Sequence, residues 1–128
     1  MIDHTGLVVS DPKKSRVFYE AALAPLAYAV LREIPTQHTA GKVVFGMGVK
    51  PKPDFWVAEG TPNEPRIHIA FRAESRAQVD AFYAAAMANG GRDNGPPGER
   101  PHYHEHYYGA FVTDPNGHNI EAVCHKPG

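Results

Sequence analysis

Apolar and polar residues alternate in two separate stretches of the chain, residues 2–9 and residues 66–73. A period of two residues is typical of a β-strand that buries one face. In each stretch a single histidine, His4 or His68, falls on the face opposite the apolar set. The apolar sets are Thr5, Leu7 and Val9 in the first stretch and Ile67, Ile69 and Phe71 in the second.

A helix is predicted directly after each of these two strands. Asp11 is a favoured N-cap residue, Pro12 is a favoured first residue, and apolar residues recur at helical spacing over residues 12–23. In the second half Ser75 is the N-cap, and the helix ends at Asn89-Gly90, where glycine favours termination. The two halves therefore begin with the same strand and helix.

Further segments are rich in β-branched and aromatic residues, which favour strands. Pro, Gly and Lys residues separate these segments and mark the turns between the predicted strands. The Pro- and Gly-rich segment 91–101 predicts a weak strand followed by a flexible loop. Each half thus has the order β-α-β-β-β. The other predicted strands are residues 28–34, 42–49, 54–60, about 105–113 and 118–125, with a tight turn at residues 114–117.

The two halves also match residue by residue at a constant offset. His4 and His68 are 68 − 4 = 64 residues apart, and Phe18-Tyr19 recurs as Phe82-Tyr83 at the same offset. An internal duplication explains this match. We therefore predict one domain over residues 1–128, built from modules at about 1–60 and 65–126.

Composition narrows the classes of function. With 42% apolar residues in 128, the chain can form one core. The net charge of −1 is spread along the chain, so neither nucleic acid nor a membrane surface is an expected partner. The chain has no long apolar run, no signal-peptide pattern and a lone cysteine, Cys124, which predicts a reducing, cytoplasmic location.

Two such modules bury their sheets most simply side by side. The predicted fold is α+β, in which two tandem βαβββ modules form a half-open curved barrel with the helices outside. His4 and His68 then point into the concave face. In the last strand Ile120, Ala122 and Cys124 form the apolar set, so Glu121 is predicted to face the two histidines.

The chain resembles the vicinal oxygen chelate superfamily, which includes glyoxalase I, fosfomycin-resistance transferases, bleomycin-binding proteins and extradiol dioxygenases. The family places a ligand histidine in the first strand, another in the fifth strand and a ligand glutamate in the last. The resemblance therefore implies a metal site of His4, His68 and Glu121. It is carried by DHTGLVVSDPKKSRVFYEAAL at 3–23, HIAF at 68–71 and AFVTDPNGHNIEAV at 110–123.

Two imidazoles and one carboxylate suit a divalent ion such as Fe, Mn, Zn, Ni or Co. The resemblance implies an enzyme that chelates a small oxygen-rich substrate bidentately, with lyase or isomerase (glyoxalase-like) or dioxygenase chemistry. The alternatives are a bleomycin-resistance type of protein that sequesters a small molecule without catalysis, and a fosfomycin-type group transferase. The superfamily also implies a homodimer, with each site built either within one chain or across two.

The chain departs from two of the family's specific patterns. Glyoxalase I has a second carboxylate in the fourth strand, but the offset gives 121 − 64 = 57, which is Val57, and a slip of one residue gives Trp56. Glu59 is a possible substitute on the same face. Extradiol enzymes usually carry a tyrosine ten residues before the ligand glutamate, where this chain has Phe111. A three-ligand site is therefore expected.

The stretch HYHEHYY, residues 102–108, places His102, His104 and His106 at every second position. On a strand these rings lie on one face about 7 Å apart, which is too far for three to share one ion. We therefore predict that they line the rim of the cavity. The candidate catalytic residues are His106, Tyr107 and Tyr108, and the candidate substrate-binding residues are Trp56, Arg72, His104 and Phe111; Cys124 is expected to be buried and His118 exposed.

Overall fold

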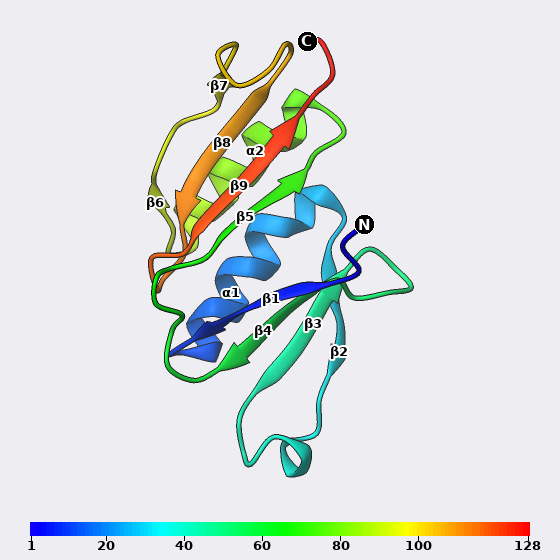
Figure 1. Cartoon of the computed structure of the whole chain (residues 1–128), viewed down its shortest axis with the longest axis vertical. Coiled ribbons are helices and arrows are strands. Elements are labelled where there is room, and N and C mark those ends of the chain that lie inside the picture. Colours follow the sequence, from blue (N-terminus) through cyan, green and yellow to red (C-terminus); the bar gives the residue numbers. More distant parts are fainter.

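The computed structural model describes residues 1–128, and its main elements follow the predicted order (Figure 1). The helices are α1 (Pro12–Leu23) and α2 (Arg76–Ala88), with short 3-10 helices η1 (Ala24–Leu26) and η2 (Thr36–His38). The strands are β1 (Thr5–Val9), β2 (Ala29–Glu33), β3 (Val44–Gly48), β4 (Phe55–Glu59), β5 (His68–Arg72), β6 (Arg92–Asp93), β7 (Gly98–Glu99), β8 (Tyr108–Thr113) and β9 (Asn119–Cys124).

The strands form two sheets with the same topology. The first sheet has the order β1-β4-β3-β2, and the second has the order β5-β9-β8-β6, with β7 paired to β8. In each sheet the first strand of the module pairs in parallel with the last, whereas the other pairs are antiparallel. No backbone pairing joins the two sheets, so β1 and β5 are both edge strands.

Both helices lie on the same side of the two sheets, and the opposite side is left uncovered (Figure 1). The two helices also pack against each other. This arrangement confirms the predicted α+β class with helices outside an open, unclosed sheet structure. We call the side of each sheet without helices its uncovered face.

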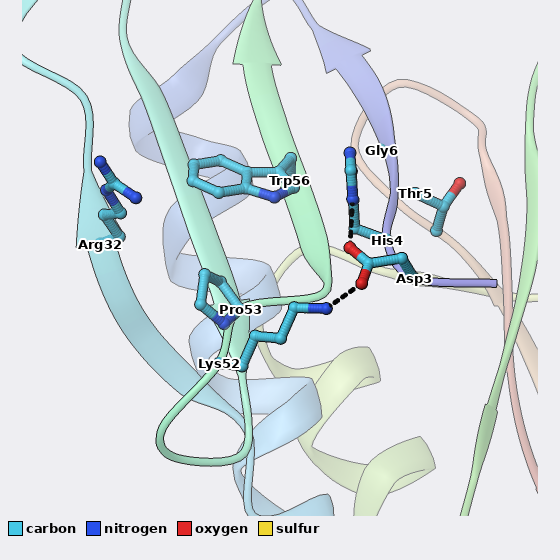
Figure 2. Close-up of a pocket in the computed structure, with 8 residues that line it drawn as sticks. All are labelled: Asp3, His4, Thr5, Gly6, Arg32, Lys52, Pro53 and Trp56. Carbon is cyan, nitrogen blue, oxygen red and sulfur yellow. Dashed lines mark hydrogen bonds and ion pairs between the residues drawn. The ribbon is translucent and has the colours of Figure 1, made fainter.

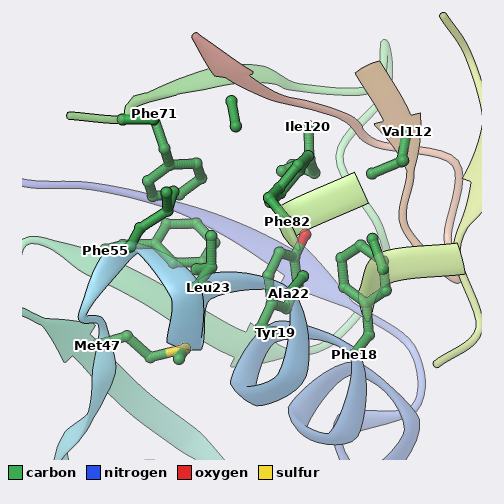
Figure 3. Packing of buried hydrophobic residues seen from close by; sticks show 14 of the residues in the cluster. Phe18, Tyr19, Ala22, Leu23, Met47, Phe55, Phe71, Phe82, Val112 and Ile120 are labelled. Carbon is green, nitrogen blue, oxygen red and sulfur yellow. The ribbon is translucent and has the colours of Figure 1, made fainter. Parts of the chain in front are cut away.

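One hydrophobic core runs through both modules (Figure 3). Tyr19 of α1 meets Phe55 of β4 edge to face at 5.1 Å between ring centroids. Phe55 meets Phe71 of β5 at 5.2 Å in the same geometry. Such pairs add to the free energy gained by burying aromatic surface. The contact between Phe55 and Phe71 joins the modules into one unit, and Cys124 is buried in the same core, as predicted.

Local sequence signals explain where the helices begin. The Asp11 side chain accepts a hydrogen bond from the Lys14 N–H at 3.2 Å, and Pro12 is the first helical residue. The Ser75 side chain accepts one from the Gln78 N–H at 3.2 Å. Each cap satisfies a backbone donor that the helix itself leaves free. Neither helix has the length and apolar character needed to cross a bilayer.

The prediction that His118 is exposed is wrong, because its side chain is fully buried between the modules. Its Nδ1 accepts a hydrogen bond from the Ile67 N–H at 3.0 Å, and its Nε2 donates one to the Val8 carbonyl at 2.9 Å. The ring is therefore neutral and held in one tautomer. His118 thus links the start of β5 to the end of β1, a long-range role that its position after a turn does not indicate.

The predicted strand at about 105–113 begins later than expected, at Tyr108. Residues 101–106 form a series of turns, and His106 has a left-handed backbone with φ of 61°. His102, His104 and His106 therefore do not share one face of a strand. The alternation in this stretch occurs in a loop, where no neighbouring strand holds an extended backbone.

Candidate functional site

One row of residues crosses all four strands of the first sheet, and we call it the Trp56 row. Arg32 of β2 lies opposite Gly46 of β3, and Trp56 of β4 lies between Gly46 and Gly6 of β1. A Cβ atom at Gly46 would lie 2.9 Å from the Trp56 ring, and one at Gly6 would lie 2.7 Å from the Trp56 carbonyl oxygen. Gly46 therefore makes room for the indole, whose far edge lies directly over it, and Gly6 makes room for the Trp56 backbone.

Arg32 reaches the uncovered face because β2 contains a bulge. Val30 packs against the core, and strict alternation would turn Arg32 to the same side. The pairing register shifts between Val30 and Arg32, so the extra residue Leu31 reverses the alternation. Glu33 consequently faces the helix side, where it binds Arg16 of α1 at 2.7 Å.

A cavity of about 610 Å³ lies over the Trp56 row (Figure 2). Figure 2 shows the indole of Trp56 between Arg32 on one side and the Asp3–His4 pair on the other. The cavity is lined almost entirely by polar or small residues, so the indole is its main apolar surface. The lining residues are Asp3, His4, Thr5, Gly6, Arg32, Lys52, Pro53 and Trp56.

Most charged groups of this cavity have an ion-pair partner, but one does not. Asp3 accepts hydrogen bonds from Lys52 and from Nδ1 of His4, the latter at 2.7 Å. The Lys52 ammonium, and then His4, lower the pKa of Asp3 below its usual value, so the carboxylate stays charged. Arg32 forms no ion pair. The cavity therefore offers one free guanidinium.

The uncovered face of the second sheet carries a buried carboxylate. Glu121 of β9 is only 2% exposed, and its Oε1 lies 3.0 Å from Nε2 of His68 on the neighbouring strand β5. The Tyr107 hydroxyl donates a hydrogen bond to Oε2 of the same carboxylate. Burial, and then this hydrogen bond, raise the pKa of Tyr107, so its hydroxyl remains protonated. Both carboxylate oxygens thus have partners.

A glycine makes this arrangement possible. A Cβ atom at Gly109 of β8 would lie 3.1 Å from the Tyr107 ring and 3.5 Å from Oε2 of Glu121. The missing side chain leaves space for Tyr107 to cross over β8 to the carboxylate. Tyr107 was one of several catalytic candidates, but its contact with Glu121 depends on the fold of the 101–106 loop and is not visible in the sequence.

The structure brings together two of the three predicted metal ligands. His68 and Glu121 are in direct contact, whereas His4 contacts Asp3. No group of three His, Cys, Asp or Glu side chains in this chain is placed to hold an ion. His4 and His68 do line a common cavity of about 350 Å³ between the edges of β1 and β5. The expected convergence of all three ligands therefore does not occur within one chain.

The residue equivalent to Glu121 in the first module is Trp56, not Val57. Glu121 lies opposite Ala70 of β5, and Trp56 lies opposite Gly6, which corresponds to Ala70 at the offset of 64. Val57 is buried in the core. The last strands are therefore offset by 121 − 56 = 65 residues. The first module has an indole where the second has a carboxylate.

The possible substitute Glu59 is also committed elsewhere, because its Oε1 accepts a hydrogen bond from the Val43 N–H at 2.9 Å. Tyr108 was a catalytic candidate, but its hydroxyl binds Asp80 of α2 at 2.7 Å. It therefore lies on the helix side of β8, away from Glu121. Its hydroxyl is therefore bound to α2 and does not reach the His68–Glu121 pair.

The other candidates lie around these two regions. Phe111 is next to the His68 ring, at 6.4 Å between centroids. Arg72 pairs with Glu74 at 3.5 Å and extends into solvent. His104 contacts the His125 ring at 5.6 Å, and His106 lies beside Glu105 at the 101–106 loop. Sequence reasoning missed Arg32, Asp3 and Lys52, because only the bulge in β2 and the folded cavity bring them together.

Comparison with known protein families gives one match. The model of the Glyoxalase/Bleomycin resistance protein/Dioxygenase superfamily matches residues 1–122. A search of the curated proteins finds no match.

Solved structures include several chains of similar fold. A glyoxalase/bleomycin resistance protein from Albidiferax ferrireducens T118 is 28% identical, with a TM-score of 0.68 and 97% of each chain covered. A glyoxylase/bleomycin resistance protein/dioxygenase domain from Frankia sp. EAN1pec is 16% identical, with a TM-score of 0.71 over 97% of this chain and 96% of that one. A mutant of glyoxalase I from Zea mays is 20% identical, with a TM-score of 0.71, and 95% of this chain matches 45% of that enzyme.

Proposed function

This chain belongs to the Glyoxalase/Bleomycin resistance protein/Dioxygenase superfamily, and we propose that it is a metal-dependent enzyme acting on a small oxygen-rich substrate. The superfamily includes enzymes such as glyoxalase I. In this proposal His4, His68 and Glu121 hold a divalent ion, and the reaction is of the lyase or isomerase type or a dioxygenation.

The pair formed by His68 and Glu121 is the observation that carries the proposal. A carboxylate that is 2% exposed on an otherwise uncovered sheet face loses most of its hydration, a cost that a positive partner offsets. An imidazole and a carboxylate in contact are two side chains of the kinds that a divalent ion accepts as ligands. An ion bound there would act as a Lewis acid toward two adjacent substrate oxygens.

The chain's own residues prepare this pair. The Tyr107 hydroxyl donates to Oε2 of Glu121 and fixes the orientation of the carboxylate, while Oε1 faces His68. Hydrogen bonds from outside the ligand set commonly hold metal-binding side chains in this way. Because the Tyr107 hydroxyl is committed to the Glu121 carboxylate, we assign it a positioning role.

We propose that the third ligand, His4, comes from a second copy of the chain. Within one chain His4 is not grouped with His68 and Glu121, and its side chain is exposed. A two-fold dimer would bring the first sheet of each copy to the second sheet of the other and form two equivalent sites.

Metal analysis of protein purified without added metal tests the proposal. We expect a bound transition metal, a lower melting temperature after treatment with a chelator, and loss of the metal in Glu121→Gln. His102→Ala is the matched control, since this exposed loop histidine lies outside the proposed ligand set and packs on the Tyr103 ring, and it should retain the metal. Absence of metal together with no effect of the chelator would show that the chain is not a metalloenzyme.

Mixing two defective variants separates a shared site from a site within one chain. His4→Ala and Glu121→Gln should each fail to bind metal as pure proteins. After unfolding and refolding together, random pairing should restore about a quarter of the sites if each needs residues from two copies. No restoration, with dimers present, would place all three ligands in the same chain.

A second candidate function is the sequestration of a small molecule without catalysis. It is favoured by the self-contained network of Glu121, which already has both His68 and Tyr107 as partners without an ion. This function predicts tight binding of an unmodified compound by protein that contains no metal. The metal analysis therefore also decides between the two candidates.

A further inference from the structure

We propose that the cavity over the Trp56 row binds a planar monocarboxylate, with a conjugated or aromatic ring on the indole of Trp56 and the carboxylate on Arg32. This inference rests on the proposed function only in taking the cavity as the substrate cavity. The binding itself needs no metal ion. It adds a substrate class and two specificity-determining residues.

The indole provides a flat floor for a ring. Its far edge lies over Gly46, and Pro53 lies near the same glycine, since a Cβ atom at Gly46 would be 3.0 Å from Cβ of Pro53. The ring lines the cavity as its main apolar surface and is half-buried (Figure 2). Offset stacking on such a surface favours flat conjugated ligands over saturated ones. Trp56 therefore selects for planarity.

The charge of the cavity selects for a single negative charge. Lys52 is paired with Asp3, and Asp3 also binds His4, so the only unpaired cation is Arg32. A guanidinium group matches the geometry of a carboxylate through two parallel hydrogen bonds. A dianion such as a phosphate ester would bring a second negative charge that no unpaired cation of the cavity offsets.

The spacing of the row fits such a ligand. Arg32 and Trp56 are two strands apart, which corresponds to about 10 Å between their backbones. The indole itself extends toward Arg32, because its far edge lies over Gly46, which has no side chain. The arginine side chain and a carboxylate attached to a stacked ring together bridge this distance.

The bulge at Leu31 supports a dedicated role for Arg32. A regular β2 strand would turn this side chain toward the core, where an unpaired guanidinium would be costly. Bulges often change the direction of a side chain beside a binding site. Here the bulge places the one free cation of the cavity in the same row as the indole of Trp56.

The fluorescence of Trp56 tests the proposal directly, because it is the only tryptophan of the chain. Full-length protein is titrated as purified and after removal of metal by a chelator. The probes are benzoate, the neutral planar benzamide, the saturated cyclohexanecarboxylate and phenyl phosphate. We expect saturable quenching by benzoate in both preparations, with weaker binding of the other three.

Arg32→Gln should weaken benzoate binding about 10-fold or more and leave the binding of benzamide unchanged. Arg92→Gln is the matched control, an exposed arginine on β6 outside this cavity, and it should bind benzoate normally. Trp56→Leu, followed by calorimetry, should reduce the preference for benzoate over cyclohexanecarboxylate.

No quenching by benzoate, equal binding of benzoate and benzamide, or full binding by Arg32→Gln would each overturn the inference. Tighter binding of phenyl phosphate would overturn the carboxylate assignment. Binding of benzoate by protein that holds no metal would support this inference even if the metal proposal fails. The two proposals can therefore fail separately.

Discussion

Tyr19 and Asp114 form a hydrogen bond of 2.6 Å inside the core, where the tyrosine hydroxyl donates to Oδ2. Burial, and then the nearby Asp114 carboxylate, raise the pKa of Tyr19 well above its usual value. The hydroxyl therefore stays protonated in the folded chain at a pH where it would ionise in the unfolded chain. A raised folded-state pKa means that this contribution to stability is complete below about pH 10 and is lost as the pH rises further.

We predict that Tyr19→Phe lowers the free energy of unfolding by about 1–3 kcal/mol at neutral pH, because Oδ2 of Asp114 loses its donor. Above about pH 10 the difference from the unmodified protein should shrink, since phenylalanine cannot ionise. Urea unfolding at several pH values measures this. The exposed residue Tyr103 gives the control Tyr103→Phe, and a difference that stays constant with pH would contradict the assignment.

The positioning role of Tyr107 leads to a second prediction. Tyr107→Phe should weaken metal binding about 10-fold, because Glu121 loses the hydrogen bond that orients it. Metal titration measures the affinity of the variant for the ion, and thermal unfolding of the metal-free variant measures any general loss of stability. If Tyr107→Phe changed only the melting temperature and left metal affinity unaltered, the tyrosine would be purely structural.

At the scale of elements, the helices could be predicted more fully than the site. The bounds of α1 match the predicted residues 12–23, because the Asp11 cap and Pro12 act within one turn of the helix. The strand predicted at about 105–113 begins only at Tyr108, since alternation alone does not show whether a neighbouring strand is present.

The site depends on longer-range effects. A bulge of one residue in β2 sets the side of the sheet on which the Arg32 side chain lies. The bulge reverses the alternation of side chains, and the apolar pattern of the sequence does not indicate it. A similar shift of one residue makes Trp56, and not Val57, the equivalent of Glu121. Contact between His68 and Glu121 could be predicted, because both lie on regular strands that pair directly.

Strand β3 offers a prediction at this scale. Gly46→Ala should displace the indole, because the new Cβ atom would lie 2.9 Å from the Trp56 ring. We expect tryptophan emission to shift toward that of a solvent-exposed indole, with a loss of about 1–3 kcal/mol in stability from overpacking. Gly98→Ala is the control, since its Cβ atom would meet only the end of the Arg100 side chain. An unchanged emission spectrum would contradict the described packing.

For the whole molecule, His118 is a fully buried polar link between the modules. His118→Leu keeps a side chain of similar bulk but leaves the Ile67 N–H and the Val8 carbonyl without their partners. We expect a loss of about 2–4 kcal/mol in the free energy of unfolding. Denaturant unfolding measures this, with His102→Leu as the exposed control. Equal stability of the two variants would mean that the link contributes little.

The core shared by the two modules has a consequence for how the chain can be produced. A fragment ending near residue 60 would expose Phe55, and a fragment beginning near residue 65 would expose Phe71, so neither should remain folded alone. Expressed together, they regain that aromatic contact and the bond from His118 to Val8. We therefore expect the two fragments to assemble into the native fold without a covalent connection through residues 61–64. Co-purification of the two fragments would measure this assembly.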